Sequence, residues 1–288
     1  MLAGANDDIV RELLSVHRPE FATADVVPCG EGQDHVAFDV NGELIVRFRK
    51  EAGFAERAAL VAAEARLLDE IADALPVAVP TIAFVDATHG CLAYRKLPGT
   101  PLLQQPRTSR AAWAETTGEA VGRSLAAMHA LPPARMAAFV GTQPVARLVF
   151  SHSDLGIEHI LIDPRTGTVT GIIDWSDAAM VDPAYDVGLL YRDLGPAALD
   201  AILRSELGAG DDSLRERPCS MRDAASSRTL RMDRTTAGRS TSTRVSPHSV
   251  GCSSDRPPAR RRGSEAARRR RQAPCEPCQT WSPGGSSR

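Results

Sequence analysis

The patterned part of this 288-residue chain stops abruptly near residue 217. After Glu216 the sequence contains no Ile, Phe, Tyr or Lys, and its single aromatic residue is Trp281. No helical or strand period runs through this region, and it offers too little apolar surface to form a core. A globular fold is therefore expected only within residues 1–217, followed by a disordered, arginine-rich tail over residues 218–288.

The two parts also differ in charge. From Pro218 onward 15 arginines face five acids, which gives +10; because the whole chain carries −2, residues 1–217 carry −12. An acidic body argues against nucleic acid as a partner and suits a cationic small molecule, although a charged surface also serves solubility alone. The arginines of the tail have no interleaved aromatic side chains that could stack on bases.

The abrupt change suggests a hypothesis about the gene. Only two lysines occur, Lys50 and Lys96, and the composition changes within a few residues. An out-of-frame translation of a GC-rich gene would explain both observations. Reading the other two frames beyond codon 217 tests it.

The cysteines and the N-terminus indicate a cytoplasmic protein. Cys29 and Cys91 stand alone in the body, so no disulfide framework is expected. Cys275 and Cys278 have the spacing of a zinc knuckle, but no second Cys/His pair stands at ligand distance. The N-terminus has no apolar signal segment, and no run reaches the ~18–20 apolar residues of a membrane span. No membrane partner is expected.

Residues 1–97 are expected to form a small α+β lobe. Asn41-Gly42 is a strong hairpin signal between two apolar, strand-like stretches. A long segment with helical spacing follows, and Glu64 falls within it. The expected elements are a helix over 6–17, strands over 26–29, 36–40, 44–48, 81–85 and 91–95, a Gly30-Glu31-Gly32 turn, and a helix over 55–75.

Residues 98–217 are expected to form a second, mostly helical lobe after a Pro98-Gly99 break. Its expected helices cover 111–131, 184–194 and 197–207, and its expected strands cover 160–162 and 169–173.

Two acids stand at the ends of neighbouring strands in this second lobe. Asp154 lies in a polar loop before the first strand, Asp174 ends the second, and His159 lies between them. Two carboxylates and a histidine in this order suit a divalent-metal and general-base site, which phosphoryl transfer to a hydroxyl requires. The simpler alternative is that the acids only cap strand ends.

The order of these features resembles the aminoglycoside phosphotransferase family, antibiotic kinases with a protein-kinase-like fold. The likeness rests on His152-Ser153-Asp154, His159 and Asp174, and continues through Asp182-Pro183-Ala184-Tyr185-Asp186. Most members have Asn at the position of His159, whereas the 2''-aminoglycoside and macrolide kinases are similar to this chain in having His. The resemblance covers roughly residues 20–207 and implies a bilobal α+β fold: an antiparallel-sheet N-lobe that binds nucleotide and a mostly helical C-lobe.

The resemblance also implies roles in the second lobe. Asp154 would accept the proton of the acceptor hydroxyl, and His152 and Asp186 would brace the loop. Asp174 and His159 would hold Mg²⁺. A structural role for His159 remains an alternative, because imidazole is a poorer Mg²⁺ ligand than an oxygen.

In the first lobe the resemblance implies a site for ATP or GTP. Its glycine turn is similar to the hairpin that covers the nucleotide, although two glycines in a turn are common. Arg47 stands where kinases place a Lys paired to a helix Glu, and residues 91–97 match the hinge that meets the purine. The nucleotide-binding residues implied are Gly30, Gly32, Arg47, Glu64, Tyr94 and Lys96.

Two departures from the family bear on activity. Only about 20 residues separate 131 from 152, where the family usually inserts one or two more helices, and the arginine-rich tail replaces its last helices. The C-lobe is therefore expected to be truncated, with apolar faces left uncovered. Three functions stay open: an O-phosphotransferase for a cationic antibiotic (aminoglycoside or macrolide), a kinase of a metabolite such as choline, homoserine or a sugar, and a non-catalytic remnant.

Overall fold

The computed structural model describes residues 6–32, 34–50, 53–143, 147–205 and 214, which all lie within one compact unit, Met1–Arg239. The tail expected over 218–288 and the last two residues of the helix expected over 197–207 lie outside the described residues.

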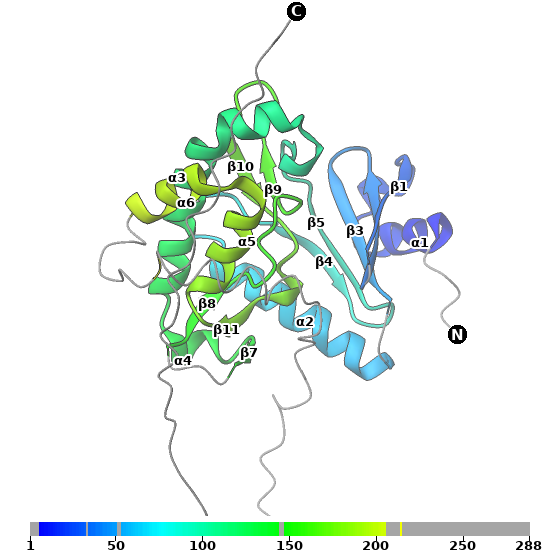
Figure 1. The fold of residues 1–288 in the computed structure, drawn as a ribbon. Helices are drawn as coiled ribbons and strands as arrows, with labels where there is room; N and C mark the ends of the chain where they lie inside the picture. The colour runs from blue at the N-terminus through cyan, green and yellow to red at the C-terminus, as the bar shows by residue number, and fades with distance from the viewer. Residues whose placement is uncertain (1–5, 33, 51–52, 144–146, 206–213, 215–288) are drawn as a thin grey trace, which may run out of the picture. The chain divides into compact units, whose positions relative to one another are not determined.

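The N-terminal part of the chain forms a five-stranded antiparallel sheet with the strand order β1-β2-β3-β5-β4 (Figure 1). Its strands are β1 Val26–Glu31, β2 His35–Val40, β3 Leu44–Arg49, β4 Ile82–Asp86 and β5 Cys91–Arg95. The antiparallel lobe predicted from the alternating apolar residues is confirmed.

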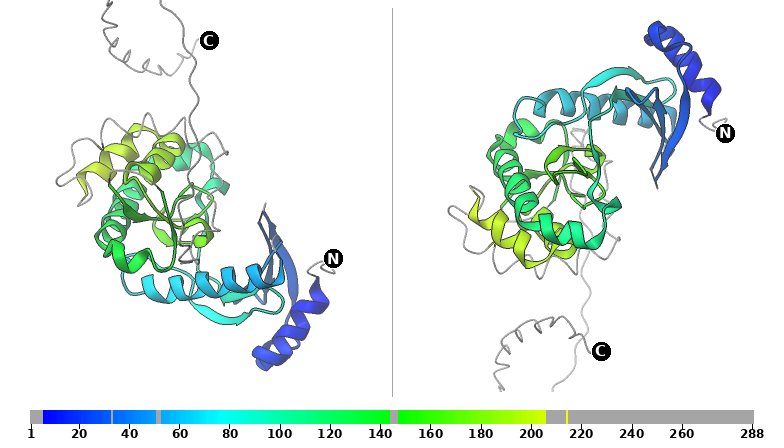
Figure 2. Two further views of the ribbon diagram at one scale, coloured as in Figure 1. Left: turned by 90° about the horizontal axis from the view of Figure 1, so that it is seen from below. Right: turned by 90° about the horizontal axis from the view of Figure 1, so that it is seen from above.

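Helix α1, Asp7–His17, covers the outer side of this sheet (Figure 2). Asn6 caps this helix: its side chain accepts a hydrogen bond of 3.0 Å from the N–H of Ile9. The short 3₁₀ helix η1, Pro19–Phe21, follows. The core between these helices and the sheet includes Val10, Leu14, Phe21, Phe38, Val46 and Phe48.

The turn at Asn41-Gly42 has the expected geometry, whereas the predicted glycine turn is partly wrong. Both residues of the first turn have positive φ, 55° and 72°, as a type I′ turn requires, and the loop between β2 and β3 comprises residues 41–43. Gly30 and Glu31, predicted in a turn, instead belong to β1, opposite Ala37 and Val36. Pairing with β2 extends the strand past the glycine, with a register shift between Pro28 and Gly30.

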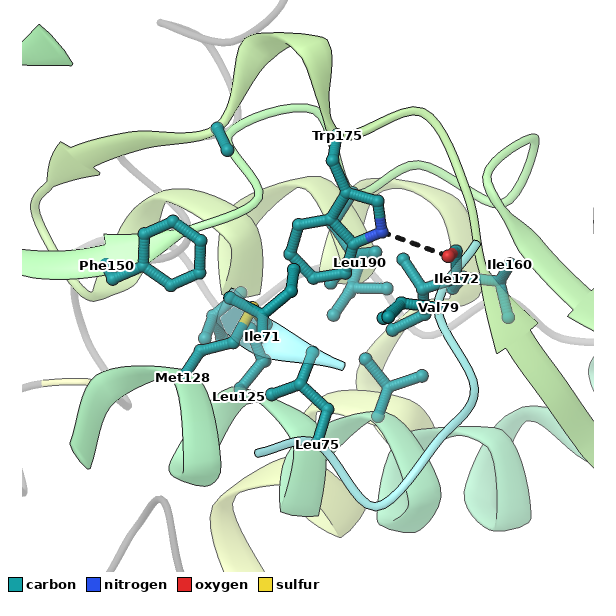
Figure 3. Close-up of a cluster of buried hydrophobic side chains, with 14 of the residues drawn as sticks. Ile71, Leu75, Val79, Leu125, Met128, Phe150, Ile160, Ile172, Trp175 and Leu190 are labelled. Atoms are coloured by element: carbon teal, nitrogen blue, oxygen red, sulfur yellow. Dashed lines mark hydrogen bonds between the residues drawn. The ribbon is translucent and has the colours of Figure 1, made fainter. Parts of the chain in front are cut away.

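Helix α2, Phe54–Ile71, ends earlier than the predicted Leu75 and contributes to a second core. Ile71 of α2 lies in a cluster of buried side chains, most of which come from after residue 120, as Figure 3 shows. Trp175 lies over this cluster, and its indole N–H donates a 3.0 Å hydrogen bond to the carbonyl of Ile172. The labelled members are Ile71, Leu75, Val79, Leu125, Met128, Phe150, Ile160, Ile172, Trp175 and Leu190.

The C-terminal part combines helices with two small sheets. Helices α3 and α6 pack against each other, and Gly118 and Gly122 allow the close approach, since a Cβ on either would lie 2.6 Å or less from an atom of α6 or of Ser205. The helices are α3 Arg107–Ala130, α4 Pro133–Met136, α5 Ala184–Leu194 and α6 Pro196–Arg204, with the 3₁₀ turns η2 Leu102–Gln104 and η3 Trp175–Asp177. The predicted α5 is confirmed to the residue, and α3 begins four residues before its predicted start at 111.

The two small sheets have the orders β10-β9-β6 and β7-β11-β8. The sequence predicted only the β9–β10 pair, which is confirmed as antiparallel. The strands are β6 Thr100–Pro101, β7 Gly141–Thr142, β8 Val149–Ser151, β9 Ile160–Ile162, β10 Val169–Ile172 and β11 Ala179–Val181. Elements α4, β7 and β8 fill the connection from 131 to 152 that was expected to be short.

The prediction of uncovered apolar faces on the C-lobe helices is not met in the described residues. The exposed large hydrophobic side chains that the structure describes are Val16, Val27, Phe54 and Leu103, and none of these lies on α3, α5 or α6. Within the described part of the chain, no helix is long and apolar enough to cross a membrane.

Candidate active site

The loop between β8 and β9 is held in place by hydrogen bonds to one buried carboxylate. Asp186, on the first turn of α5, accepts the backbone N–H of His152 through one oxygen and that of Ser153 through the other, both at 2.9 Å. Burial raises the pKa of Asp186 to about 7, although these backbone donors oppose the shift. Ser153 has a φ of 66°, a left-handed conformation that this anchoring sustains.

His152 braces the same loop from inside. It is fully buried, and its Nε2–H donates to the carbonyl of Ile173 at 2.9 Å. Its Nδ1 accepts the N–H of Asp154 at 3.3 Å, which is the pattern of a neutral ring. Burial lowers the pKa of His152 to about 3, which agrees with this assignment. The ring therefore orients the backbone at Asp154 and carries no charge into the site.

Asp154 presents a half-exposed carboxylate, with 49% of its side-chain surface accessible. Burial raises its pKa to about 6; His159 opposes the shift, and the nearby acids Asp177 and Glu158 add to it. A carboxyl group with this pKa is largely ionised at pH 7 yet basic enough to take a proton from a hydroxyl.

The ring of His159 lies between Asp154 and Asp174. Its Nδ1 lies 2.7 Å from the carbonyl oxygen of Asp154, and since a carbonyl only accepts, this nitrogen carries the hydrogen. In the neutral ring the lone pair is then on Nε2, which lies 3.7 Å from Oδ2 of Asp174. A nitrogen lone pair and a carboxylate oxygen thus face each other.

Asp174 follows β10 with a left-handed φ of 63°, and its two oxygens have different partners. Oδ1 accepts from Arg47 at 2.7 Å and from the hydroxyl of Ser176 at 3.0 Å, whereas Oδ2 is the oxygen that faces His159. Burial alone would raise the pKa of Asp174, but the positive charge of Arg47 outweighs it and the pKa falls well below its usual range.

Arg47 on β3 connects this acid to α2. It is buried, and its Nη2 donates to Glu64 while Nη1 donates to Asp174. Burial opposes its charge, but the carboxylates of Glu64 and Asp174 prevail and raise its pKa. The predicted pairing of the strand cation with the helix acid is therefore present, with an additional bond to the acid that follows β10.

The remaining predicted residues have other neighbours. A Cβ on Gly30 would lie 4.0 Å from the Cβ of Ala37, whereas Gly32 has open space there, and the N–H of Gly32 donates to the carbonyl of His35 at 2.9 Å. Tyr94 is buried on β5, and burial raises its pKa to about 12, so its phenol is neutral. Lys96 forms an ion pair of 2.6 Å with Asp39 on β2.

Three residues that sequence reasoning did not select support the site. Ser176 holds Asp174, and Asp193 on α5 accepts the N–H of Ile157 in the loop at 3.3 Å. Asp177 contributes negative charge beside Asp154. The position of Ser176 two residues after the acid is the only local signal that could have indicated it.

The residues present suit a divalent ion only together with phosphate. Among the described residues no group of three or more His, Cys, Asp and Glu side chains is arranged to hold a metal alone. Oδ2 of Asp174 and Nε2 of His159 offer two ligands, and Mg²⁺ is commonly bound by one or two protein groups plus phosphate oxygens.

Comparison with known families decides what this arrangement is. The model of the phosphotransferase enzyme family, APH, matches residues 25–143 and 136–219. The chain belongs to this family. It is thus a phosphotransferase by descent, with the kinase-like α+β fold expected from its sequence.

The two matched segments of the APH family overlap at residues 136–143, within the connection between α3 and β8. The second segment ends at 219, next to the change in composition at 217. Both departures seen in the sequence therefore coincide with limits of the family match.

Solved structures share the fold of this APH family member at low sequence identity. The GDP complex of aminoglycoside 2'-phosphotransferase-IIIa is 20% identical with a TM-score of 0.64, covering 77% of this chain and 90% of that chain. The GDP and kanamycin complex of APH(2")-IIia is 21% identical with a TM-score of 0.61, covering 76% and 90%. Macrolide 2'-phosphotransferase MphH from Brachybacterium faecium is 21% identical with a TM-score of 0.60, covering 76% and 89%. No curated protein matched the sequence.

Proposed function

We propose that this chain is an O-phosphotransferase that moves the γ-phosphoryl group of ATP or GTP to a hydroxyl of a cationic antibiotic, of the aminoglycoside or macrolide type. The observation that carries the proposal is the continuous series of contacts from Glu64 through Arg47, Asp174 and His159 to Asp154. In the proposed function this series consists of a phosphate-binding cation, two metal ligands and a general base.

Each residue of the series has a task in this proposal. Asp154 orients the acceptor hydroxyl and takes its proton as the new phosphate ester bond forms. Asp174 and His159 hold Mg²⁺, which when bound neutralises charge on the β- and γ-phosphates. Arg47 contacts phosphate oxygens and is itself oriented by Glu64.

The charge around Asp154 supports a cationic acceptor. Asp177 and Glu158 lie near enough to add to the rise of its pKa, and the pKa of Tyr185 is raised by burial first and then by Asp186, Asp154 and Asp177. Acids gathered beside the base attract an ammonium-bearing substrate and disfavour an anionic one. Solved structures with a similar fold include a kanamycin complex of APH(2")-IIia and a gentamicin complex of APH(2")-IIa, which agrees with this class.

A second candidate function is nucleotide binding without transfer. It is favoured by the division of the family match into two segments at residues 136–143 and by the end of the match at residue 219. The helices missing there would shape the acceptor side in the family.

We also retain the hypothesis that the chain is read out of frame after residue 217. We expect a cytoplasmic location, where the nucleotide donor is available.

The experiment proceeds in two steps. First, thermal unfolding of the purified protein is measured with Mg-ATP and Mg-GTP; stabilisation by either supports a nucleotide site, and its absence with both contradicts the proposal. Second, transfer of labelled γ-phosphate is measured with kanamycin, gentamicin, a macrolide, choline and homoserine. Transfer to an antibiotic supports the first candidate, transfer only to a metabolite would replace the acceptor class, and stabilisation without any transfer identifies the second candidate.

A further inference from the structure

Arg47 divides its guanidinium between two carboxylates that approach from different parts of the chain. Nη1 lies 2.7 Å from Oδ1 of Asp174, which follows β10, and Nη2 contacts Glu64 of α2. The side chain is 6% exposed, so solvent screens neither contact strongly. The bridge occupies the same carboxylate that would hold a metal ion.

The third nitrogen of the same guanidinium, Nε of Arg47, is buried and has no hydrogen-bond partner among the described residues. A buried unpaired donor is costly, particularly on a charged group. A phosphate oxygen would satisfy this donor, and the guanidinium fork suits a phosphate geometrically.

Arg47 and a divalent ion compete for one acid. Oδ1 of Asp174 already accepts from Arg47 and from Ser176, so only Oδ2 faces His159. An ion bound there would lie close to a fixed positive charge and would be repelled by it. A triphosphate that binds the guanidinium reduces this repulsion and adds oxygen ligands for the metal.

We propose that Arg47 makes metal and nucleotide binding mutually dependent, by neutralising Asp174 until a triphosphate engages the guanidinium. The inference rests on the proposed function, since it assumes that a nucleotide binds beside Arg47. A lysine would not act in this way, because its ammonium is a single point charge that does not form two fixed, directed contacts with separate carboxylates. Metal alone then binds weakly to this protein, and the nucleotide enables its binding.

The test is the affinity of the nucleotide-free full-length protein for Mn²⁺, followed by electron paramagnetic resonance of the unbound ion. Arg47→Lys retains the charge and is expected to pair with Glu64, which releases Asp174; Mn²⁺ affinity should rise by about tenfold. Glu64→Gln leaves Asp174 as the remaining anionic partner of Arg47, and Mn²⁺ affinity should fall. If Arg47 served only to stabilise the fold, Arg47→Lys and Glu64→Gln would not be expected to change Mn²⁺ affinity in opposite directions.

Arg49→Lys is the matched control. Arg49 lies on the same strand and is similarly buried, and its Nη1 lies 3.3 Å from Nε2 of His35, so its guanidinium has a different neighbour from that of Arg47. Mn²⁺ affinity should stay within about twofold of the parent protein. Thermal melting of each variant shows that the comparison is made between folded proteins.

Nucleotide affinity is measured separately by calorimetry with a non-hydrolysable triphosphate. It distinguishes a failure of the mutual dependence from a failure of the proposed function. If Arg47→Lys is folded, binds nucleotide and shows Mn²⁺ affinity equal to or below that of the parent, the mutual dependence is wrong while the proposed function stands. If the parent binds no nucleotide, the proposed function and the inference both fail.

Discussion

Nε2 of His159 lies 3.7 Å from Oδ2 of Asp174, while the other ring nitrogen of His159 is held by the carbonyl of Asp154. The backbone contact thus fixes the tautomer and directs the lone pair of the ring toward the acid. The proposed metal ligands are therefore one nitrogen and one oxygen, which differ from the two oxygen ligands that Asn and Asp would provide.

This pair of ligands predicts a metal preference. Nitrogen ligands favour first-row transition metals relative to Mg²⁺, which prefers oxygen. His159→Asn should lower the ratio of Mn²⁺ to Mg²⁺ affinity by about tenfold in the presence of a non-hydrolysable nucleotide. Competition between the two ions, followed by paramagnetic resonance, measures the ratio, and an unchanged ratio would indicate that His159 has a structural role.

The general base can be tested by a substitution that keeps its shape. Asp154→Asn should lower kcat by about 10² to 10⁴, because the amide cannot accept the proton, while the Kd for nucleotide changes little. Asp163→Asn is the control, since Asp163 pairs with Arg165 in the exposed turn between β9 and β10. Equal losses of kcat and of nucleotide affinity in Asp154→Asn would contradict the assigned role.

The pKa of Asp154 predicts the pH dependence of transfer. Burial raises this pKa to about 6, and the base acts only when deprotonated. The value of kcat/KM should therefore be nearly constant above pH 7 and fall about tenfold for each pH unit below 6. Glu158→Gln removes a neighbouring negative charge and should move the break to lower pH. A profile that stays flat down to pH 5 would exclude Asp154 as the titrating group.

The anchor of the loop gives a prediction for stability. Asp186 accepts two backbone N–H groups on separate oxygens, and an amide in its place offers only one acceptor. Asp186→Asn should lower the free energy of unfolding by roughly 1–3 kcal/mol because one buried donor loses its partner. Denaturant unfolding measures the change; a variant as stable as the parent would mean that the loop does not depend on this contact.

The end of the family match predicts that residues 220–288 contribute little to the fold. Leu214 is the last described residue and is buried in the larger core, and the match ends at 219. Truncation after residue 219 should shift the Tm by less than about 2 °C in a calorimetric scan. A large drop would show that residues beyond 219 take part in folding.

The sequence indicated the longer elements because each carries a local signal. Asn6 caps α1, Asn41-Gly42 turns the hairpin, and α5 begins after Asp182-Pro183. The catalytic motif was equally readable, because its spacing determines which residues meet. These features depend on neighbours within a few positions along the chain.

What the sequence did not indicate depends on contacts between distant residues. Strands β6, β7, β8 and β11 have two or three residues each, too few to show a period of two. The left-handed backbone at Ser153 and Asp174 is sustained by the surrounding fold, and because neither residue is a glycine, the sequence does not indicate a positive φ there. The second contact of Arg47 joins residues 127 positions apart, so only the folded chain reveals it.

The arginine on β3 also affects how such proteins are detected. Reagents that tag nucleotide-binding enzymes by acylating an amine beside the triphosphate require a lysine there, and a guanidinium does not react in its place. The two lysines of this chain form ion pairs with Glu31 and Asp39 on the neighbouring strands β1 and β2. Surveys of kinases that depend on lysine labelling will therefore tend to miss phosphotransferases built in this way.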